Sequence, residues 1–255
     1  MSQSNAGAAP EKAMPSMISD PNGEAKLSPI TLELFRGAAK EFANELQRNP
    51  MRELYGVTDG KAVGTKVEAM FKEYLQKRYE IFVGNAAHGL DFPTLNLDLK
   101  VTSSKQPQSS CPFRAATQKI YGLGYNLLVI VYSKRDVESE HVSYLDIKNV
   151  VYIDKERTAD YTLTTEILNI ISKMEEEETC DRDVVRDELD ALLENKNIPL
   201  DEVSRSALAN RLIDNPPKQG VLTISNALQW RLQYSRAINI TKNKDSVLGV
   251  EDLYA

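Results

Sequence analysis

The sequence predicts a mixed α/β fold, in which a central mixed sheet is flanked by helices and followed by a helical C-terminal region. Three observations predict it. Apolar and polar residues alternate strictly over residues 95–102, which is typical of a strand with two unlike faces. Residues 125–132 form a continuous apolar run rich in β-branched residues, the pattern of a strand buried on both faces. Helical periodicity before and after these strands completes the α/β pattern.

Two helices are expected ahead of the main strands. Residues 30–46 and 64–79 carry apolar side chains at helical spacing. In the second helix the apolar stripe consists of Val67, Met70, Phe71, Tyr74 and Leu75. Short strands are expected at 80–84 and 89–92, directly before the alternating strand.

Beyond the alternating strand, a helix over 113–121 is expected to end at Gly122. Residues 141–153 indicate a further strand, and only helices follow it. The helices are expected at 161–177, 182–195, 201–214 and 223–239, the last capped by Thr223 or Ser225.

The chain divides into three predicted parts. Residues 1–27 are rich in Ser, Ala, Pro, Gly and Met without periodicity, which indicates a flexible N-terminal tail. Residues 28–180 hold the predicted α/β core, and residues 181–255 form the predicted helical C-terminal region. No internal repeat is apparent.

Composition excludes several classes of protein. The 255 residues are 42% hydrophobic and 27% charged, which is ordinary for a soluble globular protein. The longest apolar run, near 127–132, is far shorter than the roughly 20 residues of a membrane span. The N-terminus has no basic-then-apolar pattern of a secretory signal. Two cysteines, Cys111 and Cys180, make neither a disulfide framework nor a zinc cluster, so we expect a protein of the reducing cytoplasm without membrane contact.

Charge is spread unevenly along the chain. The net charge is −6, yet residues 99–135 contain six basic side chains and no acidic one. Residues 136–202 contain 20 acidic and 7 basic side chains, and residues 203–244 contain seven basic and one acidic. Two basic segments around an acidic one could fold into a DNA-facing side and a solvent-facing back. Scattered solvated faces explain the same pattern, so charge alone does not decide.

The segment 89–100 holds the residues that indicate chemistry. Asp91 ends a predicted strand, and Asp98 and Lys100 project from one face of the next strand because side chains alternate with period two. Two carboxylates at neighbouring strand ends can hold a hard divalent cation such as magnesium. A lysine beside that cation can hold a phosphate or position and deprotonate an attacking water. These groups suit phosphodiester hydrolysis, although an edge strand with one solvent-facing side would show the same alternation.

Glu68 is a third candidate carboxylate. It lies on the helix before the sheet, beside the apolar stripe, where it could point along the sheet edge towards the two aspartates. A surface glutamate paired with Lys72 at i+4 is the plainer alternative.

This arrangement resembles the PD-(D/E)xK nuclease superfamily: a helix with Glu68, then Asp91, then Asp98-x-Lys100, then a helix and a buried strand. Two longer segments are similar to a group of prokaryotic type II restriction endonucleases. They are LDFPTLNLDLKVTSSKQPQSSCPFRAATQKIYGLGYNLLVIVYSK and PPKQGVLTISNALQWRLQYSRAI, and the likeness extends over roughly residues 55–240. Leu90 stands where the motif name has proline, and only six residues separate the two aspartates.

The resemblance implies a restriction-endonuclease-like fold, with residues 28–180 as the nuclease core and residues 181–255 used for DNA binding or dimerisation. It implies Asp91, Asp98, Lys100 and Glu68 as catalytic residues, with the three carboxylates as ligands of Mg²⁺. It also implies a prokaryotic cytoplasmic homodimer that cuts a short specific double-stranded DNA sequence to leave 5′-phosphate and 3′-hydroxyl ends.

Candidate DNA contacts follow the catalytic strand. Ser, Gln and Lys side chains suit phosphates and base edges, and a glutamine carboxamide offers the donor–acceptor pair that matches adenine. The candidates in the loop are Ser103, Ser104, Lys105, Gln106, Gln108 and Ser109. Arg114 and Gln118 share a face of the next predicted helix, and Arg231 and Arg236 lie in the C-terminal region. An ordinary surface loop and a solvated helix are the alternatives.

Three other functions remain open at this stage. A structure-selective repair or junction nuclease would use the same catalytic residues and ignore sequence. A non-catalytic DNA-binding regulator would use the C-terminal region and need no metal. His88 could serve as the base of a different type of nuclease, although no second metal-binding histidine lies near it in the sequence.

Overall fold

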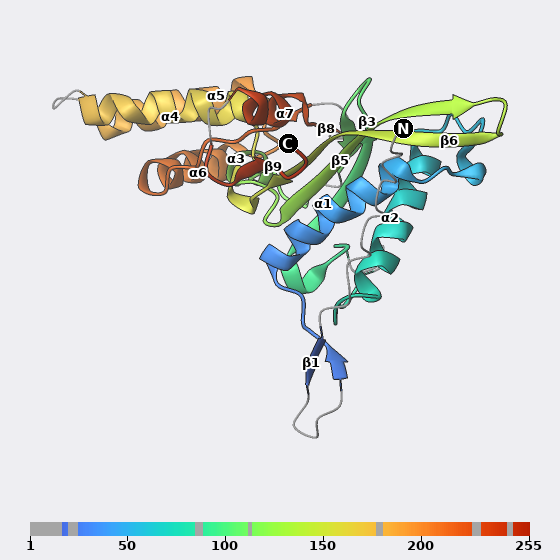
Figure 1. Ribbon diagram of the computed structural model, residues 1–255. Helices are drawn as coiled ribbons and strands as arrows, with labels where there is room; N and C mark the ends of the chain where they lie inside the picture. The colour runs from blue at the N-terminus through green and yellow to red at the C-terminus, as the bar shows by residue number, and fades with distance from the viewer. Residues whose placement is uncertain are drawn as a thin grey trace, which may run out of the picture.

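The computed structural model describes seven stretches of the chain: residues 17–19, 25–84, 89–111, 114–176, 181–225, 231–243 and 247–255. Its centre is a four-stranded mixed sheet in the order β3-β5-β6-β9 (Figure 1). The strands are β3 (Leu97–Ser103), β5 (Asn126–Val137), β6 (Val142–Ile153) and β9 (Val250–Asp252). β3 runs parallel to β5, whereas β5, β6 and β9 pair antiparallel, so the predicted mixed sheet is confirmed.

Helices α1 (Leu32–Arg48) and α2 (Gly60–Gln76) cover one face of this sheet (Figure 1). Helix α1 packs on β6 and helix α2 packs on β3. The core between them contains a group of aromatic rings, with Phe71 at its centre in contact with Phe35, Phe42 and Phe92. Both helices were predicted, and both begin at a side-chain cap, Thr31 and Asp59 respectively.

The opposite face of the main sheet is covered by a second core that includes Leu127 and Val129 of β5 and the fully buried Tyr234. A small three-stranded antiparallel sheet lies over it, in the order β4-β8-β7. Its strands are β4 (Gln108–Ser110), β8 (Arg231–Gln233) and β7 (Thr223–Ile224). Helix α7 (Ser235–Lys242) follows β8 and packs near β9.

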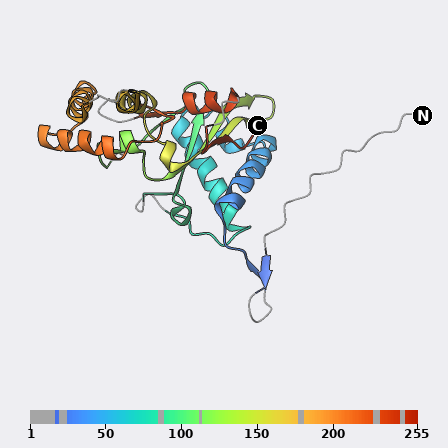
Figure 2. The ribbon, with the colours of Figure 1, turned by 90° about the vertical axis from the view of Figure 1, so that its left-hand side faces the viewer.

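A helical layer extends from one end of the molecule (Figures 1 and 2). It contains α4 (Tyr161–Glu176), α5 (Arg182–Asn195) and α6 (Glu202–Asp214), which share a third apolar core with Ile120 of the short helix α3 (Gln118–Tyr121). The three longer helices match their predicted ranges closely, because each carries a continuous apolar stripe. Single 3₁₀ turns lie at Arg52–Leu54, Pro93–Leu95 and Lys155–Arg157.

Four sequence predictions of secondary structure are wrong. Residues 80–84 and 89–92 form no strands: Glu80 and Phe92 make only isolated bridges, to Pro29 and Leu97. The expected helix over 113–121 is reduced to α3, with residues 112–113 outside the described ranges. Within the predicted tail, which is not among these four, β1 (Met17–Ser19) pairs antiparallel with β2 (Ala25–Leu27) in a hairpin that projects from the body (Figure 1).

The fourth wrong prediction is the helix over 223–239. Thr223 lies in β7, residues 231–233 form β8, and the helix begins only at Ser235. Ser225 Oγ accepts a hydrogen bond from the Arg231 N–H at 3.1 Å, beside the start of β8. Residues 226–230, which include Trp230, lie outside the described ranges. The described helices contain no stretch with the length and apolarity to cross a membrane.

Candidate catalytic and DNA-contact site

The predicted catalytic strand is β3, which lies at one edge of the four-stranded sheet. Leu97 and Leu99 point into the core under α1 and α2, and Asp98 and Lys100 point to the opposite face, as the alternation predicts. The edge position agrees with the alternative of an ordinary edge strand, but the polar face does not face solvent. Asp98 is only 7% exposed, because the second core adjoins it. A buried carboxylate on an edge strand needs partners, and the neighbouring residues supply them.

The first partner of Asp98 is Lys100, whose Nζ lies 2.6 Å from Asp98 Oδ2. Both side chains project from the same face of β3, two residues apart, so a short ion pair forms directly along the strand. The carboxyl of Asp98 also lies close enough to that of Asp91 for each to shift the pKa of the other. The sequence prediction that Asp91, Asp98 and Lys100 lie together therefore agrees with the geometry.

Asp91 reaches the site from the loop before the 3₁₀ turn at Pro93–Leu95. Its Oδ2 accepts the Leu99 N–H at 3.0 Å, on the side of β3 that has no neighbouring strand in the described sheet. Its Oδ1 lies 2.5 Å from Lys72 Nζ of α2. Lys72 is thus the partner of Asp91. It does not form the surface ion pair with Glu68 that the sequence offered as an alternative.

Burial acts on both aspartates, but their pKa values shift in opposite directions. Burial, reinforced by the hydrogen bond and the charge of Asp91, raises the pKa of Asp98 to about 6. Burial also opposes ionisation of Asp91, but hydrogen bonds from Asp98, Lys72 and the Leu99 amide outweigh it, and the pKa of Asp91 lies below its ordinary value. Two carboxylates in contact titrate as a pair, so together they retain one proton more readily than isolated aspartates do.

Glu68 and Lys100 complete the electrostatics of the site. Burial, with a contribution from Asp91, raises the pKa of the Glu68 carboxyl. Burial acts to lower the pKa of Lys100, but the adjacent Asp98 carboxylate more than compensates and the pKa is raised, so the ammonium stays charged at neutral pH. Among the described residues, no three His, Cys, Asp or Glu side chains form a group arranged to hold a metal ion. Asp91 and Asp98 are the two carboxylates in direct contact, and the charges of both act on the carboxyl of Glu68, whose role as a metal ligand stays a prediction.

The candidate DNA-contact loop is a tight turn between β3 and β4. Thr102 Oγ1 accepts the Gln108 N–H at 3.1 Å and closes the turn, and Ser103 Oγ accepts the Lys105 N–H at 3.3 Å. Ser104, Lys105 and Gln106 are exposed at its tip. Ser109 points inward, with its Oγ 2.5 Å from the hydroxyl of Tyr234, so its side chain has a structural contact.

The remaining DNA-contact candidates fall into different places. Arg114 lies against the loop of the catalytic carboxylates: a Cβ added to Gly89, whose φ is +80°, would lie 2.6 Å from Arg114 Nη2. Gln118 is engaged internally, since its Oε1 accepts the Arg114 N–H at 2.7 Å and its amide donates to the Leu123 carbonyl at 2.9 Å. Arg236 stacks over the Tyr161 ring at 3.7 Å. Arg231 is exposed on β8, directly opposite Ser110 of β4.

Comparisons with known proteins decide the family. The model of the type II restriction enzyme NspV family matches residues 29–252. The type II restriction enzyme NspV of Nostoc sp. (strain ATCC 29411 / PCC 7524) is 46% identical over 221 residues, which cover 87% of this chain and 96% of the relative. The chain belongs to the NspV family of type II restriction enzymes. No solved structure matches it.

Family membership confirms the resemblance to type II restriction endonucleases, and the mixed sheet between helices agrees with a restriction-endonuclease-like fold. The matched range includes both the segment with the two aspartates and the β7–β8 segment. Sequence reasoning missed Lys72 as the partner of Asp91. Its signal was the position one helical turn after Glu68, on the same face of α2. His88, the residue of the alternative nuclease type, lies outside the described residues.

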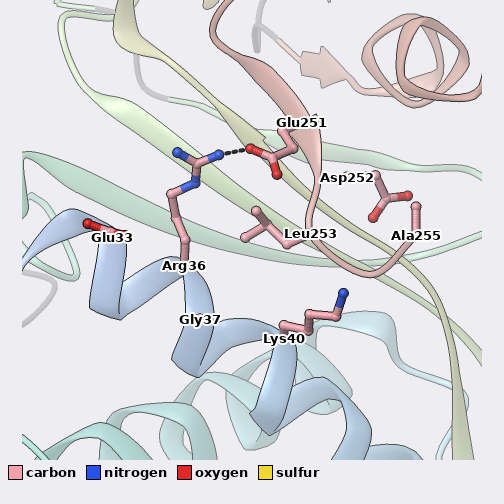
Figure 3. Close-up of a pocket in the computed structure, with 8 residues that line it drawn as sticks. All are labelled: Glu33, Arg36, Gly37, Lys40, Glu251, Asp252, Leu253 and Ala255. Atoms are coloured by element: carbon pink, nitrogen blue, oxygen red, sulfur yellow. Dashed lines mark ion pairs between the residues drawn. The ribbon is translucent and has the colours of Figure 1, made fainter. Parts of the chain in front are cut away.

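A separate hollow of about 300 Å³ lies between α1 and the end of the chain, at the β9 edge of the sheet (Figure 3). Arg36 of α1 forms an ion pair there with Glu251, and Lys40 points into the same space. None of the candidate residues of this restriction enzyme lines it. Since β3 and β9 are the opposite edges of the main sheet, this hollow is separate from the catalytic edge.

Proposed function

We propose that this protein is a Mg²⁺-dependent endonuclease that cuts double-stranded DNA within a short specific sequence and leaves 5′-phosphate and 3′-hydroxyl ends. The observation that carries the proposal is the pair of neighbouring carboxylates, the half-buried Asp91 and the buried Asp98, with the ammonium of Lys100 beside Asp98. Membership in a family of type II restriction enzymes supports the same reading. We also propose that it acts as a homodimer in the cytoplasm of a prokaryote, because a two-fold dimer suits a palindromic target.

The donor atoms fit the proposed ion. Mg²⁺ in phosphate chemistry is commonly held by one or two carboxylates, with waters and substrate oxygens completing its shell. Asp91 and Asp98 supply two carboxylates. Among the described residues Glu68 does not form a three-carboxylate group with them, so we assign to it a supporting negative charge near the ion. When bound, the ion would polarise the scissile phosphate and lower the pKa of a water molecule.

The residues of the chain have distinct proposed roles. The Leu99 N–H and the Lys72 ammonium fix both oxygens of Asp91, so this carboxylate is oriented before a ligand arrives. Lys100, held by Asp98, would place its charge beside the phosphate and stabilise the negative charge that develops there in the transition state. Arg114, which lies against Gly89, would contact the DNA backbone next to the cleaved bond.

Further DNA contacts are proposed for the exposed tip of the turn, Ser104, Lys105 and Gln106, and for Arg231. The division of the chain into a tail over 1–27, a nuclease core over 28–180 and a DNA-binding or dimerisation region over 181–255 stays a prediction. The C-terminal part is mixed in structure, because it contributes β9 to the main sheet.

The test is digestion of several sequenced, unmethylated plasmid and phage DNAs by the purified full-length protein, with Mg²⁺ and with EDTA. We expect discrete fragments only with Mg²⁺, and sequencing of their ends gives the target, the stagger and the end groups. A Mg²⁺-dependent smear would instead support a structure-selective or nonspecific nuclease. Specific binding without cleavage under every condition would support a DNA-binding regulator.

A further inference from the structure

The three-stranded sheet β4-β8-β7 has one buried and one exposed face. On β8, Leu232 is fully buried, whereas its neighbours Arg231 and Gln233 are exposed. On β7, Ile224 is buried and Thr223 is exposed, and on β4 the inward residue is Ser109. The outward face therefore carries Gln108, Ser110, Thr223, Arg231 and Gln233.

Strand register sets these side chains in two rows. Gln233 of the central strand lies directly opposite Gln108 on one side and Thr223 on the other. Arg231 lies opposite Ser110 in the neighbouring row. Opposed side chains on a sheet are about 5 Å apart, and rows two residues apart along a strand are separated by about 6.8 Å, which is close to two base-pair steps of DNA.

The chemistry of this face is uniform. Strands β4, β7 and β8 and the turn 104–107 contain no Asp or Glu, and they contain Lys105 and Arg231. They come from the two basic segments of the sequence, which the pairing of β4 with β8 joins in one sheet. Adjacent carboxamides, a guanidinium and hydroxyls match the donors and acceptors of base edges, and the absence of acidic groups suits a polyanion.

The face is also directly connected to the catalytic strand. β4 follows β3 through the short turn closed by Thr102, and the Tyr234 N–H donates to the Pro107 carbonyl at 2.9 Å. Buried contacts on the inner side, including that of Ser109 with Tyr234, hold the sheet against the core that adjoins Asp98. Side chains on its outer face are thereby held at a defined position relative to the cleavage site.

We propose that this outward face reads base edges in a groove of the double-stranded DNA target, with Gln233 and Arg231 as specificity-determining residues and Gln108 beside them. The inference rests on the proposed endonuclease function and names the surface that selects the sequence. Gln233 is the decisive residue, because it is central in the sheet, exposed and uninvolved in the catalytic ion pairs.

The test compares Gln233→Ala and Arg231→Ala with the unaltered enzyme on its mapped target and on sites that differ by one base pair. Gln76→Ala, the same truncation at an exposed residue ending α2, is the matched control. We expect each of the two variants to lose about tenfold to a hundredfold in the ratio of kcat/KM for the target over a one-base-pair variant, with an unchanged Tm. Gln233→Ala, which removes no charge, should also keep the affinity for DNA that lacks the site. The Gln76→Ala control should keep the ratio of the unaltered enzyme.

The two proposals fail in different ways. If the unaltered enzyme cuts no DNA at specific sites, the proposed function itself is wrong. If it cuts specifically while both variants keep its ratio within about twofold, the base-reading face is overturned and the function stands. A loss of binding that is equal on all DNA would also overturn base reading, because phosphate contacts weaken every sequence alike.

Discussion

The catalytic edge at β3 and the three-stranded sheet β4-β8-β7 are built from residues at very different distances in sequence. Asp91, Asp98 and Lys100 lie within ten positions of one another, and their spacing on a strand suffices to bring them together. The three-stranded sheet pairs Ser110 with Arg231, which are 121 positions apart. The candidate catalytic residues are close together in sequence, whereas the face that we assign to base reading is formed by segments that only the tertiary fold brings together.

The two regions differ equally in their environment. At the catalytic edge the charged groups are buried or half-buried and form two lysine–aspartate pairs. On the outer face of the small sheet polar groups are exposed and free of acidic neighbours on their own strands. We therefore expect substitutions at the edge to affect the cleavage step and metal binding, and substitutions on the small sheet to affect the choice of sequence.

The largest effect is expected for Asp98→Asn. Loss of one carboxylate ligand and of the partner of Lys100 should lower single-turnover cleavage at least about a thousandfold, because metal assistance contributes several kcal/mol to transition-state stabilisation. Binding to the target, measured without metal, should stay within a few-fold of the unaltered enzyme. Asp146→Asn, the same substitution at an aspartate of β6 away from the site, is the control. Equal loss of binding and cleavage would contradict the separation of the two regions.

The next effect is that of pH on metal use. Since the pKa of Asp98 is raised to about 6, a proton must leave this carboxyl before Mg²⁺ binds, and the apparent affinity should fall about fivefold between pH 6 and pH 5. Titration of cleavage with Mg²⁺ at several pH values measures this. An affinity independent of pH over that range would show that Asp98 is not a ligand.

The same group has a stability consequence of defined sign. Its folded-state pKa lies above the ordinary value of 3.8, so between about pH 4 and pH 6 the folded protein holds more protons than the unfolded chain. The stability contributed by this group is therefore present at low pH and is lost as the pH rises through about 6. Denaturant unfolding of the metal-free protein should show this dependence, and Asp98→Asn should remove it.

A smaller effect is expected for Glu68→Gln. We expect Glu68 to support the site through its charge, so its neutralisation should raise the Mg²⁺ concentration for half-maximal cleavage about tenfold and leave the maximal rate nearly unchanged. Metal titrations of both proteins test this. A loss as large as that of Asp98→Asn, not restored by excess metal, would make Glu68 a direct ligand.

The smallest effect is expected for Tyr234→Phe, which removes one hydroxyl beneath the small sheet. The lost hydrogen bond to Ser109 should lower the free energy of unfolding by about 1 kcal/mol and the cleavage rate by no more than a few-fold. A double-mutant cycle with Ser109→Ala isolates the pair. A coupling energy near zero would show that the contact does not hold β4 in place.

Sequence reasoning performed best where patterns are local. The alternation at Leu97, Leu99 and Val101 placed the strand, and the apolar stripe of α2 placed the helix, because each pattern reflects burial against a single core. The same reasoning placed Asp91, Asp98 and Lys100 in one cluster. It also expected Arg231 near DNA, but on a helix.

Where it failed, tertiary pairing overrode local preference. Arg231 and Gln233 flank Leu232 with the period of a strand, but three residues are too few for that period to be distinguished from helix. Pairing with β4 on one side and β7 on the other makes β8 a strand. Likewise the backbone around Asp91 forms no strand, because the carboxylate itself binds the Leu99 amide at the sheet edge.

The hydrogen bond between the Asp91 carboxylate and the Leu99 N–H also bears on the solubility of the protein. An edge strand offers unpaired N–H and C=O groups to any other chain, and proteins blunt such edges with charge or irregular backbone. In this molecule the carboxylate of Asp91 occupies the position at which a neighbouring strand would accept the Leu99 N–H, and Lys72 keeps a second charge beside it. Asp91, which we assign to the metal, thus also blocks the pairing of another strand with β3. An inactive Asp91 variant should therefore be more prone to self-association than an inactive Asp98 variant.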